Sequence, residues 1–387
     1  MKKDFRHIII LSIFSLFVGG ALSYIILNSE GAFFVVNSVN AEDSELKQDT
    51  QDPQVISTGS LESLTKTLKN ALNFRDKVSI GFVGDIVPGL NAPKEMLDGV
   101  AEFTKRPDIM IGNLEGVITQ SQYSKCGVES KNCFTFAGDE NFLRLLASAS
   151  FDVLNTSNNH FNDFGNEGRE DTVKKIKEQG IIPVGMKDDI TYINKNNIKV
   201  GIVGFSTFWY ANDLNNETDV VKNITEAEKN ADIVVVIFHA GGEGVNYVHT
   251  PQETEWYLGE NRGDVRLFAH KSIDAGADIV LGSGPHVLRG IETYKGKLIA
   301  YSLGNFASAS NKILNTGKHK TSAMIEATLE KDGSFVSGKV YPLELNSYLE
   351  PYPDLENTAV DTINELSLSD FGSSGVLVED SGNIILK

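Results

Sequence analysis

Short apolar runs alternate with longer amphipathic stretches through most of the chain. Each run is short enough to be a buried strand, and each amphipathic stretch has the spacing of a helix. Strands are predicted for residues 78–83, 108–111, 152–155, 181–184, 198–205, 233–238 and 278–281. Helices are predicted for residues 93–104, 141–150, 167–179, 226–230 and 264–275. This alternation predicts a layered α/β domain.

The pattern changes after residue 290, where strands follow one another without helices between them. Strands are expected at residues 290–294, 298–302, 322–329 and 334–343. A hairpin is expected to join 191–193 to 198–205 across Lys195-Asn196-Asn197. Hairpins within an alternating chain indicate mixed sheets rather than purely parallel ones. We therefore predict an α/β fold with mixed β-sheets flanked by helices.

An uncharged run, residues 8–27, follows a short basic start that holds Lys2, Lys3 and Arg6. The run is long enough to cross a bilayer as one helix. The next cation is Lys47, so the positive-inside rule keeps the N-terminus in the cytoplasm and places the body outside the cell membrane. Val39-Asn40-Ala41 also has the small residues of a cleavage site, so secretion after cleavage near Ala41 is the alternative.

These features suggest how the chain is divided. Residues 1–40 are expected to be a cytoplasmic stub with a membrane anchor or signal segment, and residues 41–76 a polar spacer with a lead-in helix. Residues 77–345 are expected to be the folded domain, and the acidic segment 346–387 a C-terminal extension. Cys126 and Cys133 share one polar loop, where they could form a disulfide outside the membrane or remain reduced thiols.

The charge of the chain limits its partners. Its 387 residues carry a formal net charge of −17. That charge argues against nucleic-acid binding, which needs a basic face. An anionic polymer would also be repelled at long range unless metal ions or a local basic patch intervened.

Polar side chains follow the predicted strands at the points where the strands end. They are Asp85, Asn113, Glu115, Asn159, His160, His239, Glu243, His286 and Asn305. Taken singly, each could be a cap, a turn residue, a solvated acid or a core histidine. The ends of parallel strands meet at one edge of a sheet, however, and that edge would gather carboxylates, imidazoles and amides. Such groups are ligands for Zn²⁺, Mn²⁺ or iron, and His160 beside Asn159 could protonate a leaving group.

The order of these motifs resembles the bacterial capsule synthesis protein CapA family, the poly-γ-glutamate biosynthesis proteins related to calcineurin-like metallophosphatases. The motifs that carry the resemblance are Gly84-Asp85, Asn113-Leu114-Glu115, Asn158-Asn159-His160 with Asp163 and Gly165, His239 with Glu243, Pro285-His286-Val287, and Tyr301-Ser302-Leu303-Gly304-Asn305-Phe306. The resemblance covers residues 78–306 and extends toward 343. One position departs from the family pattern, because Gly284 stands where the family usually has a histidine.

The resemblance implies a metallophosphatase-like fold and a site for one or two divalent ions, Mn, Zn or Fe. The implied metal ligands are Asp85 and His286 for the first ion, Asn159 and His239 for the second, and Glu115 as a bridge between them. His160 would be the catalytic acid. The residues that would support the ligands or contact substrate are Asn113, Asp163, Glu243 and Asn305.

The function that the resemblance implies is the synthesis, export or processing of poly-γ-glutamate or a related capsule polymer by a membrane-anchored, extracytoplasmic protein. Its chemistry would be metal-dependent hydrolysis or transfer at an amide or ester bond. The alternatives are a non-catalytic subunit that binds polymer or assembles the export machinery, and a phosphoesterase. The expected partners are an anionic extracellular polymer and membrane proteins of a capsule synthesis complex, with no nucleic acid.

Overall fold

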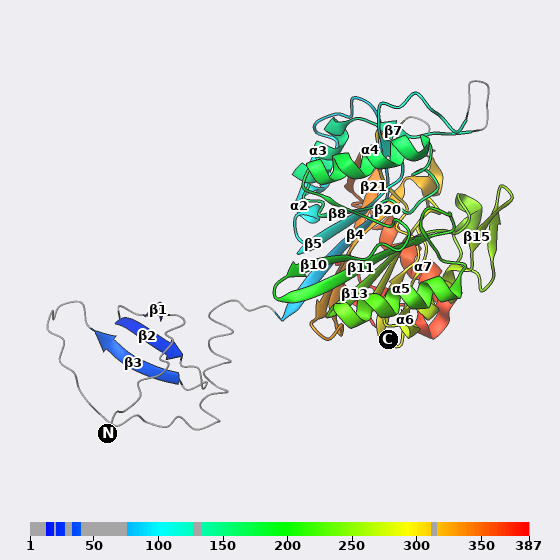
Figure 1. Ribbon diagram of the computed structural model, residues 1–387. Helices are drawn as coiled ribbons and strands as arrows, with labels where there is room; N and C mark the ends of the chain where they lie inside the picture. The colour runs from blue at the N-terminus through cyan, green and yellow to red at the C-terminus, as the bar shows by residue number, and fades with distance from the viewer. Residues whose placement is uncertain are drawn as a thin grey trace. The chain divides into compact units, whose positions relative to one another are not determined.

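The computed structural model describes residues 13–18, 21–27, 33–39, 76–126, 133–310 and 316–386. The chain divides into two units, Met1–Asn73 and Phe74–Lys387. The first unit contains an antiparallel sheet of order β1-β2-β3 (Figure 1). Its strands are β1 (Ile13–Val18), β2 (Ala21–Leu27) and β3 (Phe33–Val39).

The membrane-spanning helix predicted over residues 8–27 is not observed, because the described residues of that run form β1 and β2. Gly19 and Gly20 separate the two strands in the sequence, and a glycine inside a helix costs about 1 kcal/mol relative to alanine. The β-branched and aromatic residues on either side favour strands. Within the described ranges, no helix is long and apolar enough to cross a membrane. The spacer and lead-in helix predicted over 41–76 lie, up to residue 75, outside the described residues.

The first sheet of the second unit has the order β22-β21-β20-β4-β5-β8-β9, with β19 beside β4. Its strands are β4 (Lys77–Val87), β5 (Ile109–Leu114), β8 (Val153–Asn155), β9 (Ile182–Val184), β19 (Asn305–Ser308), β20 (Thr321–Glu330), β21 (Phe335–Leu345) and β22 (Pro351–Pro353). Strands β4, β5, β8 and β9 are parallel. Strand β20 is antiparallel to β4 and continues into an antiparallel edge with β21 and β22.

The second sheet has the order β10-β11-β13-β16-β18-β17, with β12 beside β11. Its strands are β10 (Thr191–Lys195), β11 (Ile198–Ser206), β12 (Asn212–Asp213), β13 (Ile233–His239), β16 (Ile279–Ser283), β17 (Ile291–Tyr294) and β18 (Lys297–Ala300). The central strands are parallel, and β10 and β17 pair antiparallel at the two edges. The predicted β10–β11 hairpin turns at Asn196 and Asn197, whose φ angles are 53° and 61°.

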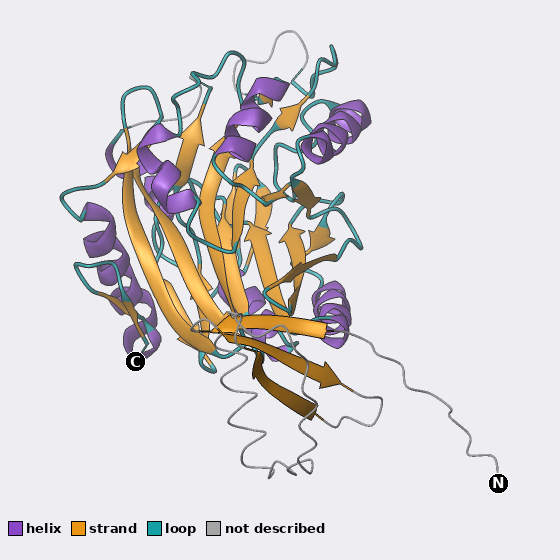
Figure 2. Cartoon of the chain, turned by 90° about the vertical axis from the view of Figure 1, so that its left-hand side faces the viewer, coloured by secondary structure: helices purple, strands orange, loops and turns teal. Residues whose placement is uncertain are grey.

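The two sheets pack face to face around an aliphatic and aromatic core. Phe82 and Ile111 of the first sheet and Ile202 and Ile237 of the second are fully buried there. Side chains alternate between the faces of a strand, so the neighbouring residues point outward toward helices. These helices are α2 (Ala101–Thr104), α3 (Glu140–Ser148) and α4 (Gly165–Glu178) on the first sheet, and α5 (Glu217–Asn230) and α6 (Val265–Asp274) on the second (Figures 1 and 2). The predicted layered α/β fold of mixed sheets flanked by helices is confirmed.

The helix predicted over residues 93–104 is shorter than expected, because only η1 (Asp98–Val100) and α2 form there. Gly99 lies inside the predicted helix, and a Cβ at this position would come within 3.0 Å of Pro351 O on β22. Glycine permits this close packing but weakens a helix. The other short elements are β6 (Val117–Ile118) with β7 (Ala137–Gly138), β14 (Glu255–Tyr257) with β15 (Glu260–Gly263), η2 (Val245–Tyr247) and η3 (Gly317–His319).

The segment 346–387, expected to be an extension, belongs to the folded body as far as it is described. Strand β22 pairs with β21, and α7 (Thr358–Phe371) places Val360 and Ile363 in the core between the sheets. The chain then continues through η4 (Gly372–Ser374), β23 (Leu377–Val378) and β24 (Ile384–Ile385). Acidic residues of α7, such as Asp361 and Glu365, lie on its exposed side. The acidic composition therefore concealed an amphipathic helix.

Replacing Ile363 with alanine tests the place of α7 in the core. Ile363 is 0 % exposed, so Ile363→Ala should lower the free energy of unfolding by about 2–5 kcal/mol. Leu368 on the same helix is 64 % exposed, and Leu368→Ala should change that free energy by no more than about 0.5 kcal/mol. Urea denaturation followed by circular dichroism measures both values. Equally small effects would contradict the packing of α7.

Candidate metal centre

The carboxyl ends of the parallel strands in both sheets supply the polar side chains of one site. Asp85 lies near the end of β4, and Glu115 directly follows β5. His239 is the last residue of β13, and His286 lies in the loop after β16. Asn305 begins β19 and is paired with Asp85 across the strands. The first sheet thus contributes the carboxylates and the second contributes two imidazoles.

Two glycines allow the chain to approach itself closely beside Asp85. A Cβ on Gly84 would lie 1.9 Å from Gly304 O, so no larger residue fits at position 84. Gly304 has a φ angle of 71°, which glycine adopts without strain. The Asp85 N–H donates to Gly304 O at 3.0 Å. This contact explains why Gly-Asp and Gly-Asn occur as pairs in the two motifs.

Asn113 is a buried hub that holds several side chains of the site. Its Nδ2 donates to Asp85 Oδ1 at 2.8 Å and contacts His239 Nδ1 at 3.1 Å. Its Oδ1 accepts from Asn155 Nδ2 at 2.9 Å and from Asn158 Nδ2 at 3.2 Å. All five residues are buried. Asn113 therefore fixes the spacing between the strand ends rather than contacting the open part of the site.

Three imidazoles surround one oxygen of the Glu115 carboxylate. Glu115 Oε1 lies 3.5 Å from His286 Nε2, 3.8 Å from His239 Nε2 and 3.9 Å from His160 Nε2. Both carboxylate oxygens and His239 Nε2 have no hydrogen-bond partner among the described residues. Ligands at about 2.1 Å from a tetrahedral ion lie about 3.4 Å from one another, close to the spacing seen here.

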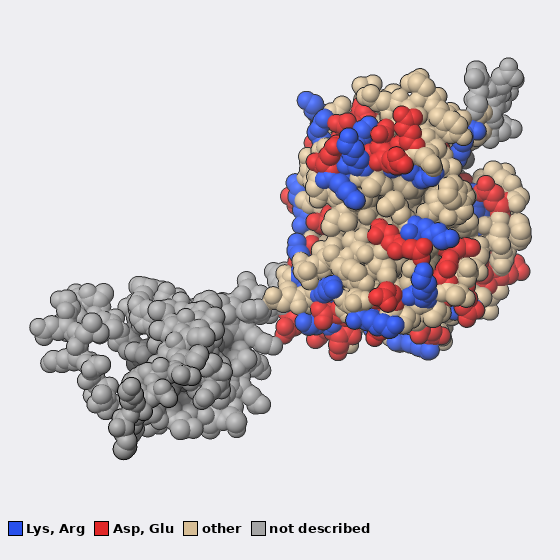
Figure 3. Space-filling model, viewed as in Figure 1, with Lys and Arg blue, Asp and Glu red and all other residues tan. Residues whose placement is uncertain are grey.

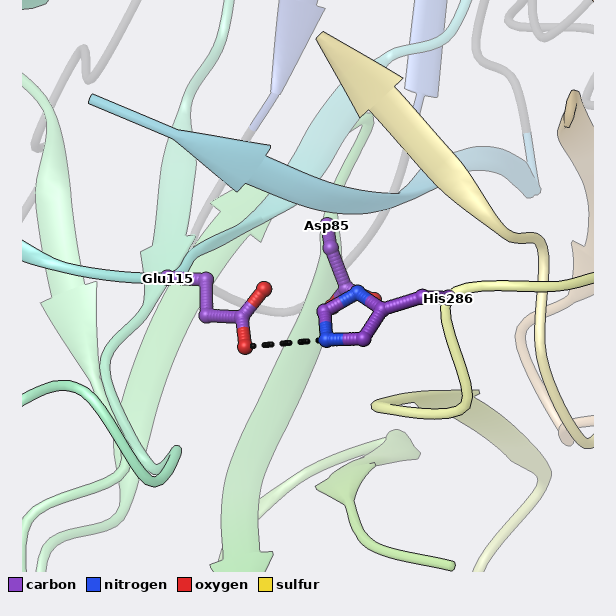
Figure 4. Close-up of side chains that lie close together, drawn as sticks. All are labelled: Asp85, Glu115 and His286. Atoms are coloured by element: carbon purple, nitrogen blue, oxygen red, sulfur yellow. Dashed lines mark ion pairs between the residues drawn. The ribbon is translucent and has the colours of Figure 1, made fainter. Parts of the chain in front are cut away.

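A compact ligand group stands out within this arrangement. One ligand atom each from Asp85, Glu115 and His286 lie within 4.8 Å of one another, and Figure 4 shows the three side chains pointing toward a common centre. Carboxylate oxygen and imidazole nitrogen suit Zn²⁺, Mn²⁺ or iron. The unpartnered buried atoms and this donor set together fit a divalent ion.

The Nδ1 atoms of His286 and His239 contact neighbouring side chains. His286 Nδ1 lies 2.9 Å from Asn305 Oδ1 and 3.2 Å from Asp85 Oδ2. His239 Nδ1 lies 3.2 Å from Ser283 Oγ, whose own hydrogen is donated to Phe238 O. For His286, a proton donated from Nδ1 to these oxygens leaves the Nε2 lone pair free for an ion.

The pKa values of the four groups follow from burial and from these contacts. Burial would raise the pKa of Asp85, but hydrogen bonds with His239 and His286 hold it well below its usual value. Burial raises the pKa of Glu115 well above its usual value. Burial lowers the pKa of His239. Burial opposes the charged form of His286 as well, but the carboxylates of Glu115 and Asp85 raise the pKa of His286 above its usual value. A cation bound among these groups would compete with protons for them.

Asn159 and Glu243 extend the site beyond this group. Asn159 Nδ2 donates to Glu243 Oε1 at 3.4 Å, and Asn159 Oδ1 has no partner among the described residues. Glu243 Oε1 is also paired with Arg262 Nη1 at 2.8 Å, whereas its Oε2 lies 3.9 Å from His286 Nε2. The Asn159 amide is thereby oriented with its nitrogen toward Glu243, and its oxygen remains available as a ligand.

His160 is held in place by a buried acid. His160 Nδ1 lies 2.8 Å from Asp163 Oδ2, which also accepts from Phe136 N at 2.8 Å. Asp163 Oδ1 is paired with Lys125 Nζ at 2.5 Å. Burial lowers the pKa of His160, while the hydrogen bond to Asp163 opposes that effect. The ring is thus fixed with Nε2 toward Glu115.

Every site residue named from the sequence lies in this cluster or in direct contact with it. The structure also joins Cys126 and Cys133 in a disulfide, and Cys133 lines the cleft. The cleft has a volume of about 950 Å³ and is lined by Asn159, His160, Glu243, His286 and Asn305 among others.

Arg262 and His319 also line the cleft and were not expected there. Arg262 does not follow a predicted strand, whereas Phe208, Trp209 and Tyr210 follow the strand predicted over residues 198–205. His319 lies between two lysines, which is typical of a solvated loop, yet it is buried.

Gly284 leaves no room for the histidine expected at its position. Its φ angle is 117°, and a Cβ would lie 2.8 Å from Ala240 O. Its backbone N–H instead donates to Asp85 Oδ2 at 3.3 Å. Residue 284 therefore supports a ligand through its backbone and adds no side chain to the site.

Comparison with known proteins identifies related chains. The model of the bacterial capsule synthesis protein PGA_cap family matches residues 66–310. The capsule biosynthesis protein CapA of Bacillus anthracis is 31 % identical over 301 residues, which cover 70 % of this chain and 68 % of that protein. The PGA biosynthesis protein CapA of Bacillus subtilis is 31 % identical over 287 residues, which cover 67 % and 70 %.

Among solved structures, a 5′-nucleotidase precursor from Thermus thermophilus aligns with a TM-score of 0.40 at 14 % identity, covering 76 % of this chain and 59 % of that one. The CapA proteins share 31 % identity with this chain, more than twice the identity of this nucleotidase. The chain therefore belongs to the bacterial capsule synthesis protein PGA_cap family, as the motifs at the strand ends predicted.

Proposed function

We propose that this chain is a metal-dependent hydrolase or transferase that acts on poly-γ-glutamate or a related capsule polymer at an amide or ester bond. The family and the names of its relatives support the polymer. The observation that carries the chemistry is the set of imidazole Nε2 atoms around Glu115 Oε1, a buried oxygen without a hydrogen-bond partner among the described residues.

The residues that would hold the metal are Asp85, Glu115, Asn159, His239 and His286. A bound divalent ion would act as a Lewis acid on a carbonyl or phosphoryl oxygen of the substrate. One or two ions of Mn, Zn or Fe fit the donor set. Bound cations would also reduce the repulsion between an anionic polymer and a chain of net charge −17.

His160 would move a proton at Nε2. Its Nδ1 is bound to Asp163, which keeps the imidazole in one orientation. Its Nε2 faces the ligand group and the cleft, where a leaving group would lie. Asp163 is in turn fixed by Lys125, so the ring has little freedom to turn away. A positioned imidazole of this kind contributes about 10²–10⁴-fold to a hydrolysis rate.

A non-catalytic role in polymer binding or export assembly is the second candidate, and one observation favours it. Gly284 supplies no ligand side chain, so the site has one donor fewer than the family pattern. Fewer ligands weaken metal affinity. The cleft would then hold polymer without breaking it.

We also propose that the body acts outside the cytoplasm. The disulfide between Cys126 and Cys133 supports this location, because such bonds persist in oxidising compartments. The basic residues Lys2, Lys3 and Arg6 ahead of an uncharged run support it as well. Membrane attachment through that run stays a prediction.

Metal binding is tested with a matched pair of histidine variants of the full chain. The wild type should bind Mn²⁺, Zn²⁺ or Fe²⁺ in calorimetry and retain it in elemental analysis. His239→Ala removes an unpartnered ligand nitrogen and should weaken binding by at least about tenfold. His249 is exposed and contacts Asp370 away from the site, so His249→Ala should bind metal as the wild type does. A wild-type chain that binds none of these ions would refute the metal centre.

The role of His160 is tested by separating metal content from turnover. His160→Ala should keep the metal while hydrolysis of poly-γ-glutamate, or of a chromogenic phosphodiester, falls by about 10²–10⁴-fold. Asp163→Asn leaves the imidazole in place but removes its charged partner, so this variant should lose less hydrolytic activity than His160→Ala. The two substrates together also distinguish a polymer hydrolase from a phosphoesterase. Wild-type protein that holds metal but cleaves neither substrate would favour the non-catalytic role.

A further inference from the structure

Aromatic side chains form much of the wall of the cleft. Trp209 lines it with 69 % of its surface exposed, and Phe134 and Leu258 are also exposed there. Phe208 and Tyr210 continue the same wall, with their rings stacked at 5.9 Å. Exposed apolar side chains gathered around a functional cleft mark a ligand-binding surface. The metal centre does not account for them.

Trp209 is held firmly beside the metal centre. The Arg169 guanidinium lies 5.0 Å from the indole ring, and Tyr210 contacts it edge-on at 5.4 Å. Tyr210 donates its hydroxyl hydrogen to Asn158 O at 2.7 Å. Asn158 directly precedes Asn159 and His160, so the aromatic wall and the site loop are one connected unit. Trp209 and His160 line the same cleft.

The cations that line the cleft are already bound to protein carboxylates. Lys125 is paired with Asp163 at 2.5 Å. Arg262 is paired with Glu243 at 2.8 Å and with Glu260 at 2.9 Å. Among the described lining residues, no other lysine or arginine occurs. A row of carboxylates or phosphates would thus find no unengaged lysine or arginine in the described lining.

The charges of the described residues in Figure 3 also form no basic patch that would attract a polyanion. On the face shown in Figure 3, the described lysines and arginines are interspersed with aspartates and glutamates rather than gathered into one basic patch. Long-range attraction of a polyanion needs such a patch. The other polar residues that line the cleft include the amides Asn162, Asn246 and Asn305 and the imidazoles His160, His286 and His319.

We propose that the cleft binds a sugar ring of a neutral glycan, stacked on Trp209 beside the metal centre. The C–H face of a sugar ring packs on an aromatic face, and its hydroxyls bond to amides and carboxylates. A volume of about 950 Å³ leaves room for more than one ring. This inference goes beyond the proposed function, because it names a second ligand that needs no metal. A capsule polymer joined to a glycan would present both a bond for the metal centre and a sugar ring for Trp209.

The two tryptophans of the sequence provide a matched pair of reporters. Trp256 is 59 % exposed on β14 and does not line the cleft, whereas its neighbour Tyr257 does. In the full-length Trp256→Phe chain, Trp209 is the sole indole, and N-acetylchitotetraose or cellotetraose should shift its emission saturably. In Trp209→Phe, the remaining indole should not respond. By calorimetry, Trp209→Ala should weaken binding at least about tenfold and Trp256→Ala by no more than about twofold.

Metal-free and metal-loaded protein are both titrated, so that the glycan site and the metal centre are judged separately. Sugar binding that persists in chelator supports the inference even if no metal centre exists. The inference is overturned if neither oligosaccharide binds, or if Trp209→Ala binds them as well as Trp256→Ala does. It is also overturned if a poly-γ-glutamate oligomer or adenosine monophosphate gives the Trp209 response and the sugars do not. Thermal melting confirms that each variant is folded.

Discussion

Glu115 is a buried carboxylate that receives no hydrogen bond from any described residue, and the site is arranged around that constraint. Moving an unpaired carboxylate out of water costs several kcal/mol. The nearest imidazole nitrogens lie 3.5–3.9 Å from its Oε1, beyond ordinary hydrogen-bond distance. A cation among them would satisfy the carboxylate and the nitrogen lone pairs together. Burial raises the pKa of Glu115, and the nearby carboxylates of Glu115 and Asp85 raise the pKa of His286 despite its burial.

Asp85 and Glu115 show how two buried acids in one site come to differ. Asp85 accepts hydrogen bonds from Asn113 and from the Gly284 backbone, and its pKa is held low despite burial by His239 and His286. Its orientation is thus set by the protein alone. The contact with Gly284 crosses from one sheet to the other, so the packing of the sheets sets the spacing of the candidate metal centre. Mutations in the core between the sheets should therefore change the distances within this site without touching its residues.

Much of the site could be predicted because its residues follow apolar strands. Asp85, Glu115 and His239 each come at the end of a buried run, and parallel strands bring such ends together. Arg262 could not be found in this way, because it reaches the cleft from the two-stranded hairpin of β14 and β15. Only tertiary packing places it there.

The predicted elements agree with the structure where hydrophobic periodicity was strong. They agree poorly where the prediction was based on amino-acid composition instead. The acidic character of residues 346–387 concealed the buried face of α7. Residues 8–27 are hydrophobic enough for a membrane helix, but their β-branched residues and the Gly19-Gly20 pair also suit a hairpin. Hydrophobicity alone does not separate these two outcomes.

Asn158 connects the two halves of the cleft. Its side chain donates to Asn113 and to Leu114 O on the metal side, and its carbonyl accepts from Tyr210 on the aromatic side. A ligand that orders the aromatic wall would therefore also order the loop that carries Asn159 and His160. Such coupling is reciprocal, so a metal that fixes Asn159 should strengthen ligand binding at Trp209 by the same factor.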